Sequence, residues 1–85
     1  MTHRIKLREE FEEAVLSGAK NFEVRRDDRG YQKGDTILFN VIDKHGRKKL
    51  SVLESLPFEI SYVLHGWGLK EGCCAFGIRR KEETQ

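Results

Sequence analysis

The sequence has few of the features that would place it in a specialised class of protein. It has one proline and only two cysteines, the adjacent Cys73 and Cys74. Neighbouring strand residues point to opposite faces, so a bond between these two would be strained and we expect no disulfide. No apolar run approaches membrane-spanning length, and the first residues lack the apolar run of a signal peptide. These absences predict a soluble cytoplasmic protein without a membrane partner.

A large excess of one charge is also missing. The 85 residues include 16 Lys and Arg against 14 Asp and Glu, which gives a formal net charge of +2. So small a net charge does not by itself indicate a nucleic-acid partner, and any basic surface must come from local clustering. A chain of this length forms one small domain that buries roughly 60–65% of its unfolded surface. We place that domain at residues 1–80 and expect residues 81–85 to be a charged tail.

Short strands around one helix account for most of the sequence. Alternation of apolar and polar residues predicts strands at residues 3–7, 21–26, 36–43, 58–65 and 73–78, and residues 48–53 would return from a hairpin turn at 44–47. Residues 8–16 combine early glutamates with apolar residues at helical spacing, and Gly18 ends that helix. The pattern predicts an α+β domain built as a β-barrel of about six short strands.

The strand at residues 21–26 carries the residues with the clearest chemical potential. Phe22 and Val24 have one parity, and Glu23 and Arg25 the other. We expect the apolar pair to face the core and the charged pair to face outward, with Lys20 leaning over the strand. An arginine fork suits a phosphate or a carboxylate, and a glutamate accepts hydrogen bonds from an amino or hydroxyl group. The alternative is that Glu23 and Arg25 only neutralise each other while Lys20 is solvated.

The residues Gly18, Lys20, Glu23 and Arg25 follow the spacing G-x-K-x-x-E-x-R, which resembles the signature of ASCH domains in the PUA-like superfamily. The wider pattern resembles a small bacterial and phage group of that family, largely without assigned function, in the segments Ala14–Gly18, Lys20–Arg29, Gly34-Asp35, Tyr62–Gly66 and Gly72–Arg79. The resemblance implies a PUA-like pseudobarrel with the helix packed near the signature. It also implies a cleft, lined by the four signature residues, that binds RNA or a nucleotide.

Two other functions remain open. Some related ASCH proteins hydrolyse an amide of an acetylated nucleoside, and their signature has a threonine nucleophile three residues after the lysine. In this chain that position is Glu23, which cannot act as a hydroxyl nucleophile. If the protein is an enzyme, Lys20 and Glu23 are the acid–base candidates. The third possibility is a protein-interaction module, because exposed strand edges can pair with a partner.

Several residues outside the signature are further candidates for RNA contacts. Basic residues beside loop aromatics often bind single-stranded RNA, which here favours Arg26, Arg29, Tyr31 and Trp67. By the resemblance, His3 borders the cleft. The alternative interpretation is that these loops are solvated and that Trp67 plugs the barrel end.

We expect neither a metal ion nor a cofactor. The three histidines, His3, His45 and His65, are far apart, and no pair has ligand spacing. Cys73 and Cys74 resemble small strand residues, one facing inward and one outward, with no activating partner evident for catalysis. The pair Gly34-Asp35 is interpreted as a structural turn that opens the next strand.

Overall fold

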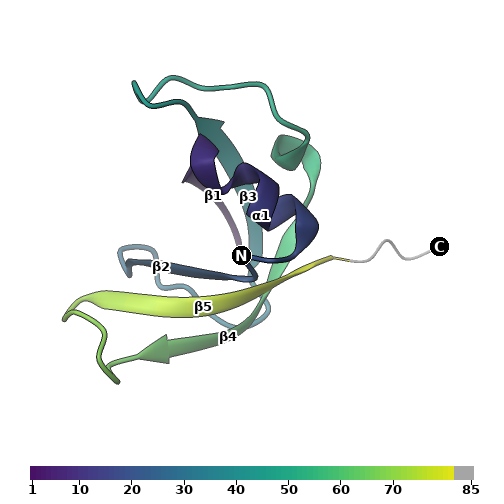
Figure 1. Cartoon of the computed structure of the whole chain (residues 1–85). Helices are drawn as coiled ribbons and strands as arrows, with labels where there is room; N and C mark the ends of the chain where they lie inside the picture. The colour runs from purple at the N-terminus through teal and green to yellow at the C-terminus, as the bar shows by residue number, and fades with distance from the viewer. Residues whose placement is uncertain (82–85) are drawn as a thin grey trace.

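The computed structural model describes residues 1–81 and contains one strongly curved, five-stranded sheet (Figure 1). The strands are β1 (Thr2–Arg8), β2 (Phe22–Arg26), β3 (Thr36–Ile42), β4 (Phe58–His65) and β5 (Cys73–Arg80). Their order is β1-β3-β4-β5-β2, in which β1 pairs parallel with β3 and the other pairs are antiparallel. The predicted tail begins at Lys81, and its other residues lie outside the described ones.

The sheet turns a sharp corner between β3 and β4. These strands pair at only two positions, Thr36 with Glu59 and Ile37 with Phe58. Beyond them the β1–β3 pair crosses the β2–β5–β4 ribbon at a steep angle (Figure 1). Strands β1 and β2 are the edges of the described sheet and do not pair with each other, so the barrel is not closed. The predicted α+β class is confirmed, and a closed barrel is not observed.

The helical segment has two parts. A 3₁₀ turn η1 (Glu9–Phe11) leads into the short helix α1 (Glu12–Ser17). Gly18 ends α1 in the left-handed conformation, with φ of 84°, and its N–H donates to the Val15 carbonyl at 3.2 Å. The sequence therefore predicted the end of the helix correctly.

The core lies inside the curve of the sheet, where the inward side chains of β1, β3, β4 and β5 meet Val15 of α1. Successive strand residues point to opposite faces, and the burial of β1, β3 and β5 alternates accordingly over most of their length. The buried apolar residues are Ile5, Leu7, Val15, Tyr31, Ile37, Phe39, Val41, Leu53, Phe58, Ile60, Cys74, Phe76 and Ile78.

The predicted strand at residues 48–53 is wrong. After the turn, only Lys48 forms a bridge, to Ile42, and the chain then enters the 3₁₀ turn η2 (Val52–Ser55). The Ser51 side chain caps this turn by accepting a hydrogen bond from the Leu53 N–H at 3.1 Å. The turn places Leu53 in the core. The described residues therefore contain five strands and not about six.

The inward and outward faces of β2 are the reverse of the prediction. Phe22 and Val24 are 49% and 56% exposed, whereas Glu23 is buried. The register explains this, because Glu23 lies opposite Phe76 and Arg25 opposite Cys74, two residues of the core face of β5. Alternation defines two faces of a strand but does not say which one is covered. The signature side chains therefore lie on the inner face of the curved sheet.

Candidate functional site

Glu23 lies at the centre of an ion-pair cluster made by three of the predicted residues. Its side chain is 7% exposed, and its carboxylate accepts hydrogen bonds from Lys20 Nζ and, at 3.1 Å, from Arg25 Nη1. Lys20 Nζ also donates to the Phe22 carbonyl at 2.9 Å, and Arg25 Nη1 to the Lys6 carbonyl at 3.0 Å. The structure thus brings the lysine, glutamate and arginine together and ties them to the edges of β1 and β2.

Two aromatic rings enclose Lys20. Its ammonium nitrogen lies 5.2 Å from the centroid of Phe11 and 5.2 Å from that of Phe22, within the range of cation–π attraction. Both rings remain partly exposed. Sequence reasoning missed Phe11 as a site residue and assigned Phe22 to the core.

A surface groove of about 350 Å³ opens over this cluster, and we call it the signature groove. It lies within the size range of small-ligand pockets, roughly 300–1,000 Å³. Four cations and one carboxylate line it, so its formal charge is 4 − 1 = +3, and none of its lining side chains has a hydroxyl or a thiol. The lining residues are Lys6, Leu7, Arg8, Phe11, Lys20, Phe22, Glu23, Val24 and Arg25.

Gly18 contributes to the site through the backbone. It forms the left-handed turn that positions Lys20, whose N–H donates to the Ala14 carbonyl at 2.9 Å. Gly18 itself lines a second groove of about 400 Å³, between α1 and the end of β5, and Lys20 borders both grooves.

The other candidate arginines gather at the neighbouring end of β2. Arg26 and Arg29 line a small groove of about 250 Å³, together with Arg25 and the accessible part of Tyr31. Arg29 Nη1 also donates to the Arg4 carbonyl at 3.3 Å. The same groove also contains Asp28, whose Oδ1 lies 4.0 Å from Arg29 Nε.

His3 and Tyr31 are both buried, and only the small accessible part of Tyr31 reaches a surface groove. The His3 ring is buried, its Nε2 lies 2.8 Å from Asp35 Oδ2, and its edge meets the Tyr31 ring at a centroid distance of 4.8 Å. The Tyr31 ring also packs against Phe76, so neither of its faces is free for stacking on a base.

Asp35 holds this buried network together. Its carboxylate also accepts from the Gln32 N–H at 3.0 Å and from the N-terminal amine at 3.2 Å. Burial acts to raise the pKa of Asp35, but the hydrogen bonds from His3, Gln32 and the N-terminus outweigh it and hold that pKa below its ordinary value. The interpretation of Gly34-Asp35 as only a turn missed this partner of His3.

Trp67 lies apart from the signature groove. It is 89% exposed, has a left-handed φ of 53°, and belongs to the loop between β4 and β5. Its ring does not plug the end of the sheet, contrary to the alternative interpretation.

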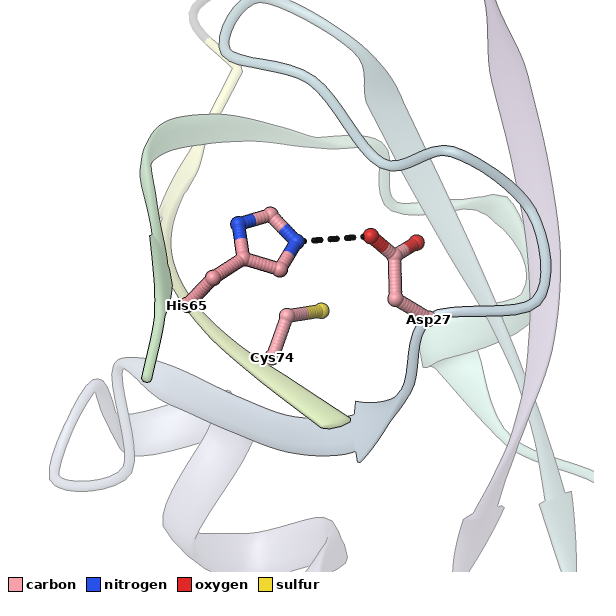
Figure 2. Close-up of side chains that lie close together, drawn as sticks. All are labelled: Asp27, His65 and Cys74. Atoms are coloured by element: carbon pink, nitrogen blue, oxygen red, sulfur yellow. Dashed lines mark hydrogen bonds and ion pairs between the residues drawn. The ribbon is translucent and has the colours of Figure 1, made fainter. Parts of the chain in front are cut away.

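Beside that loop, Asp27, His65 and Cys74 form a second polar cluster (Figure 2). Their potential ligand atoms all lie within 4.8 Å of one another, and His65 Nε2 is 2.7 Å from Asp27 Oδ2. The hydrogen bond with His65 lowers the pKa of Asp27. The sequence did not indicate this cluster.

Comparison with known proteins adds one assignment. Residues 2–78 match the model of DUF3850, a domain of unknown function, and the chain belongs to that family. The curated proteins contain no match to it. Within residues 1–81, no helix is both long enough and apolar enough to cross a membrane.

Proposed function

We propose that this DUF3850 domain binds RNA or a nucleotide in the signature groove. The observation that carries the proposal is the concentration of charge there. The groove has a formal charge of +3, whereas the whole chain has +2, and two partly exposed aromatic rings stand beside its cations. An anionic ligand with a flat apolar part, such as a nucleotide, matches both features.

The phosphate would lie against the cations that the protein does not fully use. Arg25 reaches both of its protein acceptors through Nη1, and within residues 1–81 its Nε and Nη2 have no hydrogen-bond partner. A guanidinium with a free edge binds phosphate through two parallel hydrogen bonds. Lys6 and Arg8 add positive charge along the β1 wall of the same groove.

The base would stack on the exposed rings of Phe11 and Phe22. Stacking on an aromatic side chain contributes about 1–3 kcal/mol per base and tolerates any base. Glu23 orients Lys20 and Arg25, and a carboxylate that accepts two hydrogen bonds still has lone pairs for an amino or hydroxyl group. These roles assign the rings to stacking and the ion-pair cluster to polar recognition.

The proposal includes a relationship to ASCH domains of the PUA-like superfamily and a cytoplasmic location. The relationship is supported by the G-x-K-x-x-E-x-R spacing of the residues in the groove and by the strongly curved sheet next to one short helix. The cytoplasmic location is supported by the two unpaired cysteines.

Fluorescence anisotropy with a labelled, short single-stranded RNA tests the proposal, with unlabelled mononucleotides as competitors. Arg25→Ala and Lys6→Ala should each weaken binding about tenfold, which corresponds to the loss of one charge-assisted contact of about 1.4 kcal/mol. Affinity should also fall linearly with the logarithm of the salt concentration. Lys33→Ala is the matched control, because Lys33 is exposed and does not line the signature groove. Equal affinities of the Arg25 and Lys33 variants would refute this assignment.

The structure gives less support to hydrolysis of a modified nucleoside. The lining of the signature groove has no hydroxyl or thiol to act as a nucleophile, although Lys20 and Glu23 remain in contact as an acid–base pair. A panel of acylated nucleosides decides between the two functions. Turnover that Lys20→Ala abolishes would favour the enzyme, and a wild-type protein inert on every member would exclude it.

One observation favours the protein-interaction alternative. Phe22 and Tyr62 both lie opposite Gly77, and with Val24 they form an exposed apolar face on the outside of the sheet. If this face carries the function, Arg25→Ala should have no effect, whereas Val24→Lys should abolish capture of the partner.

A further inference from the structure

Three strands that are neighbours in the sheet bring Asp27, His65 and Cys74 together at the end of β2 that is remote from Lys20. Asp27 directly follows β2, His65 is the last residue of β4, and Cys74 lies on β5 between them. His65 and Cys74 are direct cross-strand partners, and the Asp27 N–H donates to the Gly72 carbonyl at 2.8 Å. The backbone of the sheet therefore holds all three positions.

The side chains of this cluster are oriented as ligands would be. Asp27 Oδ1 accepts hydrogen bonds from the N–H groups of Gly30 and Tyr31 at 3.1 and 3.2 Å, which leaves Oδ2 to face His65. Backbone donors of this kind fix the orientation of ligating carboxylates in metal sites. Figure 2 shows the sulfur of Cys74 directed toward the space between the imidazole and the carboxylate.

The Cys74 thiol gives an independent indication of a ligand. The residue is fully buried, and its sulfur has no hydrogen-bond partner within residues 1–81. Cys74 belongs to the buried hydrophobic core, where a thiol usually meets only apolar groups. This sulfur instead lies within 4.8 Å of an imidazole nitrogen and a carboxylate oxygen.

We propose that Asp27 Oδ2, His65 Nε2 and Cys74 Sγ bind a divalent transition-metal ion of the zinc class. Nitrogen, thiolate and carboxylate ligands suit Zn²⁺ or Co²⁺, whereas Mg²⁺ and Ca²⁺ prefer oxygen alone. At zinc bond lengths of about 2.0–2.3 Å, tetrahedral ligand atoms are about 3.4–3.6 Å apart. The three potential ligand atoms are now between 2.7 Å and at most 4.8 Å apart, a range that includes the tetrahedral spacing. Small side-chain rotations therefore complete the site.

Binding involves proton transfer and no redox change. The Cys74 thiol loses its proton to solvent as the sulfur–metal bond forms. The proton that His65 Nε2 donates to Asp27 Oδ2 moves by exchange with solvent to Nδ1, so that Nε2 binds the ion as a neutral imidazole nitrogen. The hydrogen bond between His65 and Asp27 is replaced by one metal–nitrogen bond and one metal–oxygen bond. The thiolate and the carboxylate then balance the two positive charges of the ion.

Two of the three proposed ligands reach a groove that is open to solvent. Asp27 and His65 line a groove of about 510 Å³, together with Cys73 and residues of the β4–β5 loop, whereas the buried Cys74 does not line it. The ion enters through this groove, and a water molecule from it completes the tetrahedron. The site is separate from the signature groove, with which it shares no lining residue.

Titration of the full-length protein with Co²⁺, after removal of any histidine tag, tests the proposal. A thiolate-to-cobalt charge-transfer band should appear and saturate at one equivalent, and Zn²⁺ should remove it by displacing the cobalt. Cys74→Val should abolish the band, and Cys73→Ser should retain it as the matched control. Asp27→Asn, which preserves volume, should weaken Co²⁺ affinity by about 100-fold or more.

Three results would overturn the proposal: no charge-transfer band in the wild-type protein, an unchanged band in the Cys74 variant, or a band lost in the Cys73 variant. Circular dichroism verifies that each variant is folded. If the Cys74 variant does not fold, the Asp27 variant decides, and an unchanged Co²⁺ affinity in it excludes the site.

Discussion

Replacement of Glu23 by alanine tests whether the ion-pair cluster stabilises the fold as well as lining the groove. The substitution removes a buried carboxylate that accepts hydrogen bonds from Lys20 and Arg25. Both cations then lose their counter-charge while their side chains remain only 17% and 25% exposed. The expected effect is a lower free energy of unfolding.

The magnitude follows from the two hydrogen bonds that the substitution removes. Each hydrogen bond to a charged group contributes about 1.5–3 kcal/mol, and removal of one partner of a fully buried pair costs about 3–5 kcal/mol. Lys20 and Arg25 border the signature groove and can turn into water, which reduces the cost. We therefore expect Glu23→Ala to cost about 2–3 kcal/mol, a large share of the roughly 4–13 kcal/mol available to a domain of this size.

Urea denaturation followed by far-ultraviolet circular dichroism measures this cost. Trp67 is a poor fluorescence probe of folding because it is already exposed in the native state. Glu59→Ala is the matched control: Glu59 pairs with an exposed Arg79 at 2.7 Å, and such surface pairs contribute about 0–1 kcal/mol. If the two variants lose equal stability, the reasoning about Glu23 is wrong and its cations are solvated independently of it.

Three further predictions concern the network around His3. The pKa of Asp35 is lower in the folded protein than in the unfolded chain. The ionised carboxylate therefore stabilises the fold fully above the unfolded pKa of about 3.9, and this stabilisation is lost as the pH falls through the lower folded pKa. Asp35→Asn should therefore lower the free energy of unfolding at pH 7. The substitution should also make that free energy fall less steeply between about pH 5 and 2. An equally steep fall in the variant would contradict the network. Tyr31→Ala should cost about 3–5 kcal/mol in urea denaturation because Tyr31 belongs to the core. Tyr31→Phe should leave RNA affinity unchanged in the anisotropy assay, and a loss there would restore Tyr31 as a ligand contact.

Local sequence signals predicted the positions of the elements well. The strand predicted at residues 58–65 matches β4 at both ends. The strand predicted at 3–7 is one residue shorter than β1 at each end, and that predicted at 36–43 is one residue longer than β3 at its second end. Gly18 ends α1 as expected. Such signals succeed because alternation, turn glycines and helix caps act between residues close together in the chain. The segment at 48–53 failed because tertiary contacts of Leu53 outweighed a weak strand pattern.

The sequence predicted which residues of β2 share a face, but it did not predict which face is buried. Alternation in residues 22–25 separates Phe22 and Val24 from Glu23 and Arg25, and either pair can face inward. The register with β5 decides the matter by placing Glu23 opposite Phe76. Glu23 can be buried on the inner face because Lys20 and Arg25 neutralise its carboxylate. Local sequence reasoning cannot evaluate whether such a neutralisation offsets the cost of burying the charge.

The sequence by itself determined the strands, the end of the helix and the spacing that brings Lys20, Glu23 and Arg25 onto one short segment. Only the tertiary structure decided what surrounds them: Lys6 and Arg8 from β1, which complete the basic groove, and the partnership of His3 with Asp35. It also decided the meeting of Asp27, His65 and Cys74, whose positions in the chain have no ligand spacing. The physical reason is that sheet pairing places Asp27 within a few ångströms of a residue 38 positions later in the chain, and the pairing depends on how the whole core packs.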